Sequence, residues 1–189
     1  MRYAVLVAAI CMVVGAVGAT VPDRDLCTVT PCDTYGGVII CPSTIADGQF
    51  TVNVRNANND PIPNAYVELV FGTPGNHWLC NDAVLTGSTD ALGDVTFNIS
   101  GGGCTIGANA LRIIANTQEI RAFSWVKSPD FAGGAGADGY VALADFSYFA
   151  TAYGSSTYPC TDYKGTGTTD LDDFSLFAGS YGKKCPELP

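Results

Sequence analysis

The chain has 189 residues, with 9 Lys or Arg and 18 Asp or Glu, so its formal net charge is -9 at pH 7. An acidic balance of this size disfavours binding to nucleic acid, whose phosphates are also negative. After the first 20 residues, no apolar run is long enough to span a bilayer. We therefore expect a soluble protein with no membrane span and no nucleic-acid partner.

The N-terminus predicts secretion. Arg2 precedes an apolar run at residues 4–17, and the small residues Gly18 and Ala19 follow it. This arrangement is typical of a secretory signal peptide, which we assign to residues 1–19. Removal of this segment also removes Arg2, so 8 basic and 18 acidic residues remain and the net charge becomes -10. We expect the mature protein outside the cell or at its surface.

Seven cysteines follow the predicted signal peptide, and disulfides are their default state in a secreted chain. They are Cys27, Cys32, Cys41, Cys80, Cys104, Cys160 and Cys185. We predict a Cys80–Cys104 bridge around a hairpin and a Cys160–Cys185 bridge around the last helix, because each closes a short loop. The odd number predicts a third bridge and one remaining thiol among Cys27, Cys32 and Cys41.

The segment from residue 36 to residue 125 has the pattern of β-structure. Apolar residues alternate with polar ones around Phe50, Val67 and Val95, which is the period of half-buried strands. The predicted strands are residues 37–40, 50–54, 67–71, 83–88, 95–99, 111–115 and 120–126, with turns that include Gly101-Gly102-Gly103. Seven short strands predict a mainly β fold, an antiparallel two-sheet sandwich.

Two motifs in this segment carry a resemblance to a known family. The first is Asp60-Pro61-Ile62-Pro63 with the strand after it, and the second is Thr89-Asp90-Ala91-Leu92-Gly93-Asp94-Val95-Thr96-Phe97. Together they resemble the bacterial Ig-like domains of invasin- and intimin-type surface proteins. The resemblance implies an Ig-like β-sandwich over residues 20–127, a fold used by spacers, adhesins and carbohydrate-binding modules.

A repeat occupies the C-terminal part of the chain. Residues 145–154 read DFSYFATAYG, and residues 173–182 read DFSLFAGSYG, 28 residues later. Apolar residues recur at helical spacing in both copies, and Gly154 and Gly182 follow where a left-handed helix end is expected. We predict two helices, each preceded by a loop rich in Gly and Asp. At this spacing, the repeated Phe and Tyr residues are more often core than a partner-facing surface.

The repeat resembles the dockerin type I module, in which two EF-hand-type calcium loops are each followed by one helix. In that family, oxygen ligands occupy loop positions 1, 3, 5, 7, 9 and 12, with glycine at position 6. The resemblance places the second loop's ligands at Asp162, Thr166, Thr168, Asp170 and Asp173. Lys164 falls at position 3, where its ammonium would repel calcium.

The first loop offers fewer of these ligands. The same resemblance places Asp138, Tyr140 and Asp145 at positions 5, 7 and 12, whereas Gly134, Gly136 and Ala142 supply no side-chain oxygen. Asp130 takes the first position only if the residues between it and Asp138 bulge outward. We expect weak calcium binding, mainly in the second loop, and a dockerin-like module over residues 128–189.

The sequence gives little basis for catalysis. His77, the single histidine, has no nucleophile motif beside it and is expected in a solvated loop. We predict a secreted, non-catalytic attachment or assembly protein that docks through its C-terminal repeat onto an extracellular protein or onto itself. The alternative is a carbohydrate-binding subunit of a polysaccharide-degrading complex, which coplanar exposed rings among Trp78, Trp125 and Tyr66 would favour.

Overall fold

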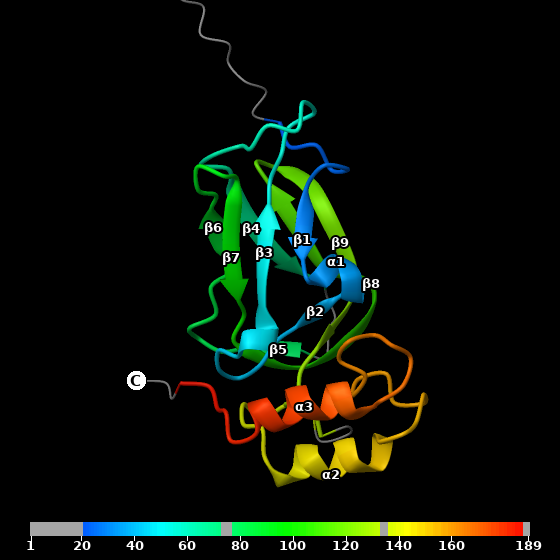
Figure 1. Cartoon of the computed structure of the whole chain (residues 1–189). Helices are drawn as coiled ribbons and strands as arrows, with labels where there is room; N and C mark the ends of the chain where they lie inside the picture. Colours follow the sequence, from blue (N-terminus) through cyan, green and yellow to red (C-terminus); the bar gives the residue numbers. More distant parts are fainter. Residues whose placement is uncertain (1–20, 73–76, 133–135, 187–189) are drawn as a thin grey trace, which may run out of the picture.

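The computed structural model describes residues 21–72, 77–132 and 136–186 (Figure 1). The predicted signal peptide, residues 1–19, and Gly134 of the first predicted loop lie outside these residues. The protein is mainly β, with two sheets and a few short helices. In the described ranges, no helix is both long enough and apolar enough to cross a membrane.

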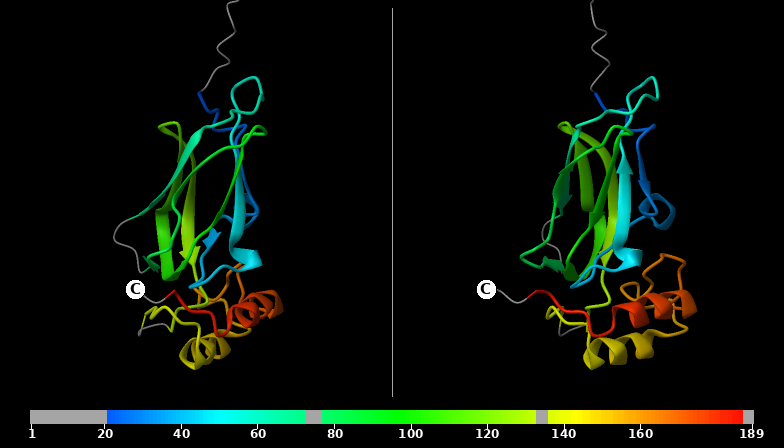
Figure 2. Two further views of the ribbon diagram at one scale, coloured as in Figure 1. Left: turned by 90° about the vertical axis from the view of Figure 1, so that its left-hand side faces the viewer. Right: turned by 60° about the vertical axis from the view of Figure 1, so that its left-hand side comes forward.

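The strands form two facing sheets (Figures 1 and 2). The smaller sheet has the order β1-β3-β7, and the larger has the order β2-β9-β8-β4-β6, with β5 paired to β8. The strand pairs are antiparallel, apart from the parallel pair β2 and β9. The bounds are β1 Thr28–Thr30, β2 Val38–Ile39, β3 Gln49–Asn53, β4 Tyr66–Phe71, β5 His77–Leu79, β6 Thr86–Ser88, β7 Asp94–Asn98, β8 Gly101–Ala115 and β9 Gln118–Lys127.

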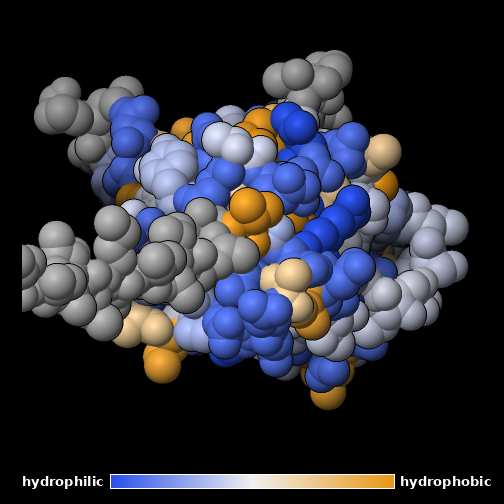
Figure 3. All heavy atoms as spheres, turned by 90° about the horizontal axis from the view of Figure 1, so that it is seen from above, coloured by the Kyte–Doolittle hydropathy of each residue, from blue (hydrophilic) through white to orange (hydrophobic). Residues whose placement is uncertain are grey.

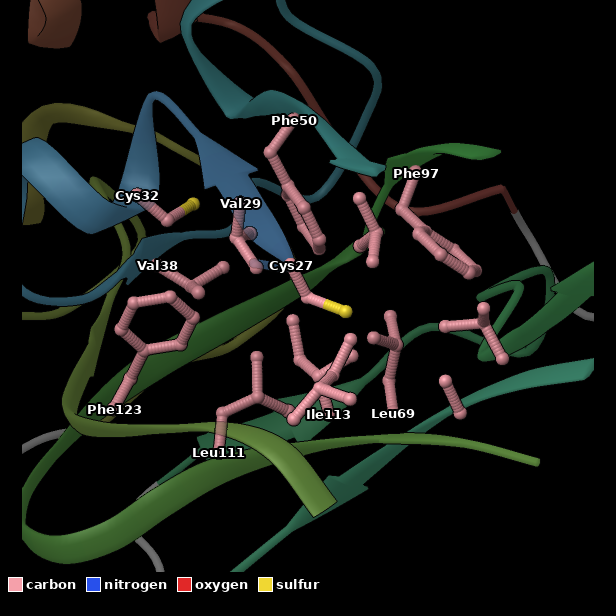
Figure 4. Packing of buried hydrophobic residues seen from close by; sticks show 14 of the residues in the cluster. Cys27, Val29, Cys32, Val38, Phe50, Leu69, Phe97, Leu111, Ile113 and Phe123 are labelled. Atoms are coloured by element: carbon pink, nitrogen blue, oxygen red, sulfur yellow. The ribbon is translucent and has the colours of Figure 1, made fainter. Parts of the chain in front are cut away.

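A single apolar core fills the space between the two sheets (Figure 4). Phe50 and Phe97 of the smaller sheet stack with their ring centroids 5.7 Å apart. Leu69, Leu111 and Ile113 enter the same cluster from the larger sheet. Burial of each such side chain contributes roughly 1.5 to 3 kcal/mol. The alternating pattern therefore marks the strand faces that turn inward, as the sequence predicts.

The predicted turn at residues 101–103 is wrong, because these glycines begin the long strand β8. A Cβ on Gly102 would overlap the carboxylate of Asp130, and one on Gly101 would lie 2.5 Å from the carbonyl oxygen of Trp78. The glycines are needed for close approach of neighbouring chain segments rather than for a turn. Strands β1 and β5, of three residues each, were not predicted.

The two predicted C-terminal helices are confirmed as α2, Leu143–Ala152, and α3, Leu171–Ser180. Gly154 and Gly182 have φ values of 78° and 80°, the left-handed conformation expected after each helix. The chain also contains a short helix α1, Cys32–Tyr35, and a 3-10 turn η1, Ala46–Gly48. Figure 2 shows α2 and α3 side by side at one end of the sheets.

The C-terminal repeat shares a second apolar cluster with the sheets. Ile39, Cys41 and Trp125 of the β-part pack with residues of the repeat, namely Val141, Phe149, Tyr163, Leu176 and Phe177. Strand β9 ends at Lys127, the last residue of the predicted first domain. The boundary itself stays a prediction, but the two sides of it are joined by a common core.

Two disulfides join the β-part to the C-terminal repeat, and the predicted pairing is wrong. Cys80 pairs with Cys185 and Cys104 pairs with Cys160, each with a Cα–Cα distance of 5.7 Å. Pairing of β5 with β8 carries Cys80 and Cys104 to the edge on which the repeat packs, so each finds its partner there rather than in a local loop. The bridges span 105 and 56 residues, for which the chain-entropy model gives roughly 4 to 5 kcal/mol each.

The predicted third bridge is also wrong, because Cys27, Cys32 and Cys41 are all free and buried. The sulfur of Cys27 bonds the backbone of Arg55, accepting from its N–H at 3.3 Å. Burial raises the pKa of all three thiols, that of Cys32 to about 12. Because the thiolate is the reactive form, these cysteines act as small apolar core residues.

Candidate functional site

The two helices of the repeat pack antiparallel through their phenylalanines. Phe146 lies 5.9 Å from Phe177 and Phe149 lies 6.0 Å from Phe174, measured between ring centroids. Phe149 and Phe177 are buried and stack on each other at 5.2 Å. Phe149 also stacks on the buried ring of Tyr163, at 6.2 Å. One side of the helix pair is thus fixed to the rest of the protein.

The first turn of each helix contains a buried aspartate that bonds the backbone of the loop before it. Asp145 accepts a hydrogen bond from the backbone N–H of Ala142 at 2.8 Å, and Asp173 accepts one from Asp170 at 2.9 Å. The side chain of Asp170 in turn accepts from the N–H of Asp172, which caps α3. Burial raises the pKa of both Asp145 and Asp173, and the backbone donors act against that rise.

In the second loop, the side chains predicted to bind calcium form hydrogen bonds with other groups of the protein. Asp162 accepts from the N–H groups of Thr166 at 2.9 Å and Gly167 at 3.0 Å. Asp173 accepts from the N–H groups of Tyr163 at 2.7 Å and Lys164 at 3.2 Å. A further pair of predicted ligands bond each other, since the Thr166 hydroxyl donates to the carbonyl oxygen of Thr168 at 3.1 Å.

The first loop repeats this arrangement and identifies Asp130 as its first residue. Asp130 accepts from the N–H groups of Asp138 at 3.1 Å and Gly139 at 2.9 Å, as Asp162 does from the equivalent residues. Asp130 precedes Asp145 by 15 residues, whereas Asp162 precedes Asp173 by 11, so the first loop contains four extra residues. Asp130 thus takes the place that the sequence assigned to it only on the condition that extra residues bulge out before Asp138.

Burial also sets the ionisation of Asp130. The side chain is fully buried, and loss of water raises its pKa to about 6, against the two N–H donors that lower it. Asp138, one of the predicted ligands, is exposed and accepts from the N–H of Tyr140 at 3.0 Å. Tyr140, another predicted ligand, forms an isolated β-bridge with Lys184. The first loop is therefore tied to the chain end as well as to β8.

Lys127 was missed by the sequence reasoning, and its ammonium contacts the second loop. Its side chain is buried, its ammonium donates to the carbonyl oxygen of Asp162, and it lies 4.2 Å from the centroid of the Trp125 ring. Burial lowers the pKa of Lys127, and the carboxylates of Asp162 and Asp173 oppose that shift. Lys164, expected to perturb this loop, forms no ion pair within the described residues.

The two loops were expected to bind calcium. Among residues 21–72, 77–132 and 136–186, no group of three or more His, Cys, Asp or Glu side chains is arranged to hold a metal ion. The loop carboxylates accept backbone N–H groups, and the Lys127 ammonium donates to the backbone carbonyl oxygen of Asp162. Weak calcium binding stays a prediction.

The other side of the helix pair is exposed and apolar. We call it the α2/α3 face and define it as Leu143, Phe146, Phe149, Ala150 and Tyr153 with their repeat equivalents Leu171, Phe174, Phe177, Ala178 and Tyr181. Equivalent residues are exposed to the same degree: 66% and 64% for the leucines, 39% and 38% for Phe146 and Phe174, and 53% and 52% for the tyrosines. The expectation that these stripes form core holds only for Phe149 and Phe177.

Two shallow hollows lie on the α2/α3 face, with volumes of about 440 and 400 Å³. The two linings consist of equivalent residues, with the roles of α2 and α3 exchanged. The first is lined by Phe146, Phe149, Ala150, Tyr153, Leu171 and Phe174, and the second by Phe174, Phe177, Ala178, Tyr181, Leu143 and Phe146. No ionisable group other than the tyrosine hydroxyls belongs to either lining. The face therefore has internal two-fold symmetry and no charge.

The aromatic residues considered for sugar binding do not form a common platform. Trp125 is only 8% exposed, beneath Lys127. Trp78 is half-buried, and a Cβ on Gly139 would lie 2.7 Å from its ring. Tyr66 is exposed on β4. The three rings differ in burial and in neighbours, so they are not the coplanar exposed set that would favour sugar binding.

His77, expected in a loop, lies in strand β5 instead. Its Nδ1 is 2.8 Å from the Thr105 hydroxyl, and its ring packs on Phe71 with centroids 4.7 Å apart. Burial lowers the pKa of His77. These contacts give the ring a packing role in the larger sheet.

Comparisons of the chain with protein-family models, curated proteins and solved structures give no match.

Proposed function

We propose that the protein is a secreted, non-catalytic attachment or assembly protein that docks through the α2/α3 face. In this proposal, residues 20–127 form an Ig-like sandwich and residues 128–189 a dockerin-like repeat. The N-terminal signal pattern and the two disulfides support secretion. The repeat supports docking, because its helices bury one side against the protein and leave the other side uncovered.

The exposure of the α2/α3 face is the observation that carries the proposal. Six of its residues are large, apolar and between 38% and 66% exposed. If a fully exposed Leu, Phe or Tyr presents roughly 200 to 250 Å², these fractions amount to about 700 Å² of contiguous apolar surface. Patches above a few hundred Å² usually mark an interaction site. The disulfides and the second apolar cluster hold this surface in place.

The carbohydrate-binding alternative is not adopted, because Trp78, Trp125 and Tyr66 do not share an exposed surface. The attachment proposal is tested by adding the purified protein to washed extracellular and surface material from its producer. We expect retention, and we expect Leu143→Glu to lower it at least tenfold by placing a charge in the face.

Ala144→Glu is the matched control, since it adds the same charge one residue away, at an exposed position outside the hollows. Retention of this variant should equal that of the wild type. Equal retention of all three proteins would overturn the proposal, as would a lack of retention of the wild type.

A further inference from the structure

We infer that the surface that covers the α2/α3 face is the α2/α3 face of a second copy of this chain, in a two-fold symmetric dimer. The inference rests on the proposed function, because it names the partner that the docking face takes. Three features of the face support it: its internal symmetry, its lack of charge and its area.

The symmetry of the face matches the symmetry of a dimer. Each hollow is formed by four residues of one helix unit and two of the other, and the repeat exchanges the two sets. Leu143 and Leu171 are the most exposed residues of the face, and the same repeat relates them. A second copy therefore presents two equivalent protruding leucines, Leu143 and Leu171, to two equivalent hollows. A partner without this symmetry fills only one of the hollows in the same way.

The distribution of charge agrees with a self-contact. The whole chain carries a net charge of -9, so two copies repel each other at a distance. The hollows contain no carboxylate or ammonium group, so no like charges meet once the faces are in contact. Nothing on the face selects a charged partner either. Burial of apolar area is the interaction that remains. Association of the two copies should strengthen when salt screens their net repulsion.

The area is sufficient for a stable dimer. Two faces of about 700 Å² each would bury at most roughly 1,400 Å² on complete mutual coverage, which lies within the 1,200 to 2,000 Å² range of specific protein interfaces. Six of the twelve large apolar residues exposed in the described part of the chain belong to this face. Figure 3 shows the opposite end of the molecule, where the surface that is not grey is mainly hydrophilic with separate apolar spots. The helix end is thus the better candidate for self-association.

Sedimentation velocity of the purified secreted protein tests the dimer, over a concentration series at about 50 and 500 mM NaCl. We expect a monomer–dimer equilibrium with a dissociation constant on the order of 10⁻⁵ M or tighter. The dimer should be favoured at the higher salt, because screening weakens the repulsion. Leu143→Glu and Leu171→Glu should each raise the dissociation constant at least tenfold, while Ala144→Glu leaves it within twofold. Circular dichroism checks that every variant remains folded.

A monomer at all concentrations up to about 10⁻³ M would overturn the inference. So would a dimer that both leucine variants leave unchanged, or one that dissociates as salt increases. The proposed docking function can be refuted independently of the dimer. If the protein is monomeric but its retention still depends on Leu143, docking stands and the second copy is wrong. If the dimer depends on Leu143 but retention does not, the dimer stands and the attachment function is wrong.

Discussion

Replacing the buried Lys127 with Met tests whether a tethered ammonium holds the second loop. The substitution keeps most of the apolar stem and removes the ammonium group. That group donates a hydrogen bond to the Asp162 carbonyl oxygen and lies 4.2 Å from the centroid of the Trp125 ring. A hydrogen bond to a charged group contributes about 1.5 to 3 kcal/mol, and a desolvated cation–π contact contributes about 2. Removal also takes away a positive charge that interacts with the carboxylates of Asp162 and Asp173.

The buried ammonium has a desolvation cost of several kcal/mol, which the substitution relieves. Because the hydrogen bond to the Asp162 carbonyl and the contact with the Trp125 ring are both lost, we expect the loss to exceed this gain and the free energy of unfolding to fall by about 3 kcal/mol. For a chain of this size, the melting temperature then falls by roughly 6 to 12 °C.

Thermal and urea unfolding measure this effect, with Lys164→Met as the matched control. Lys164 lies in the same loop and forms no ion pair in the described part of the structure, so the control should change stability by about 0.5 kcal/mol or less. The reasoning is refuted if Lys127→Met is as stable as the wild type or more stable. In that case, desolvation of the ammonium outweighs its contacts, and the loop is held by its backbone hydrogen bonds alone.

Three further predictions concern β8, β5 and the loops. Gly102→Ala should destabilise the protein by about 3 kcal/mol in urea unfolding, because the added Cβ would overlap the Asp130 carboxylate. Gly179→Ala is its control: the added Cβ would meet no atom within 4 Å, so this variant should be neutral or slightly stabilising. The single imidazole, His77, should titrate by NMR below its ordinary pKa of 6.5. Because the unfolded chain then takes up the proton first, the free energy of unfolding should fall as pH falls through that lower pKa. A titration midpoint above 6.5 would contradict the burial of His77. Calcium at about 1 mM should raise the melting temperature by less than about 1 °C relative to a chelated sample, because only weak binding is expected; a rise of several degrees would show a well-formed metal site.

The sequence predicted the parts of the fold that depend on local periodicity. The alternation around Phe50 and Val67 placed strands β3 and β4, and helical spacing with Gly154 and Gly182 placed α2 and α3. These patterns are local because each strand or helix turns one face toward the core. The side of the helix pair left uncovered was not predictable, since helical spacing alone does not show whether a stripe meets core or solvent.

The features missed by sequence reasoning depend on contacts between distant segments. The Cys80–Cys185 bridge forms because β5 and β8 bring Cys80 to the edge that contacts the repeat, which no loop length reveals. Asp130 was assigned to its loop only conditionally, because the loop contains four extra residues. A lysine at the end of a strand, such as Lys127, ordinarily indicates a solvated position. Its burial follows only from the packing of the repeat on β9.

Site-specific photocross-linking tests the docking face most directly. A photoreactive phenylalanine analogue at Tyr181, on the α2/α3 face, is compared with the same analogue at Thr151, which is exposed and outside both hollows. The protein is irradiated with its producer's own secreted material, and adducts are identified by mass spectrometry. The account predicts adducts from position 181, to a second copy of the chain, and few from position 151. Equal yields at the two positions, or no adduct at position 181, would contradict it.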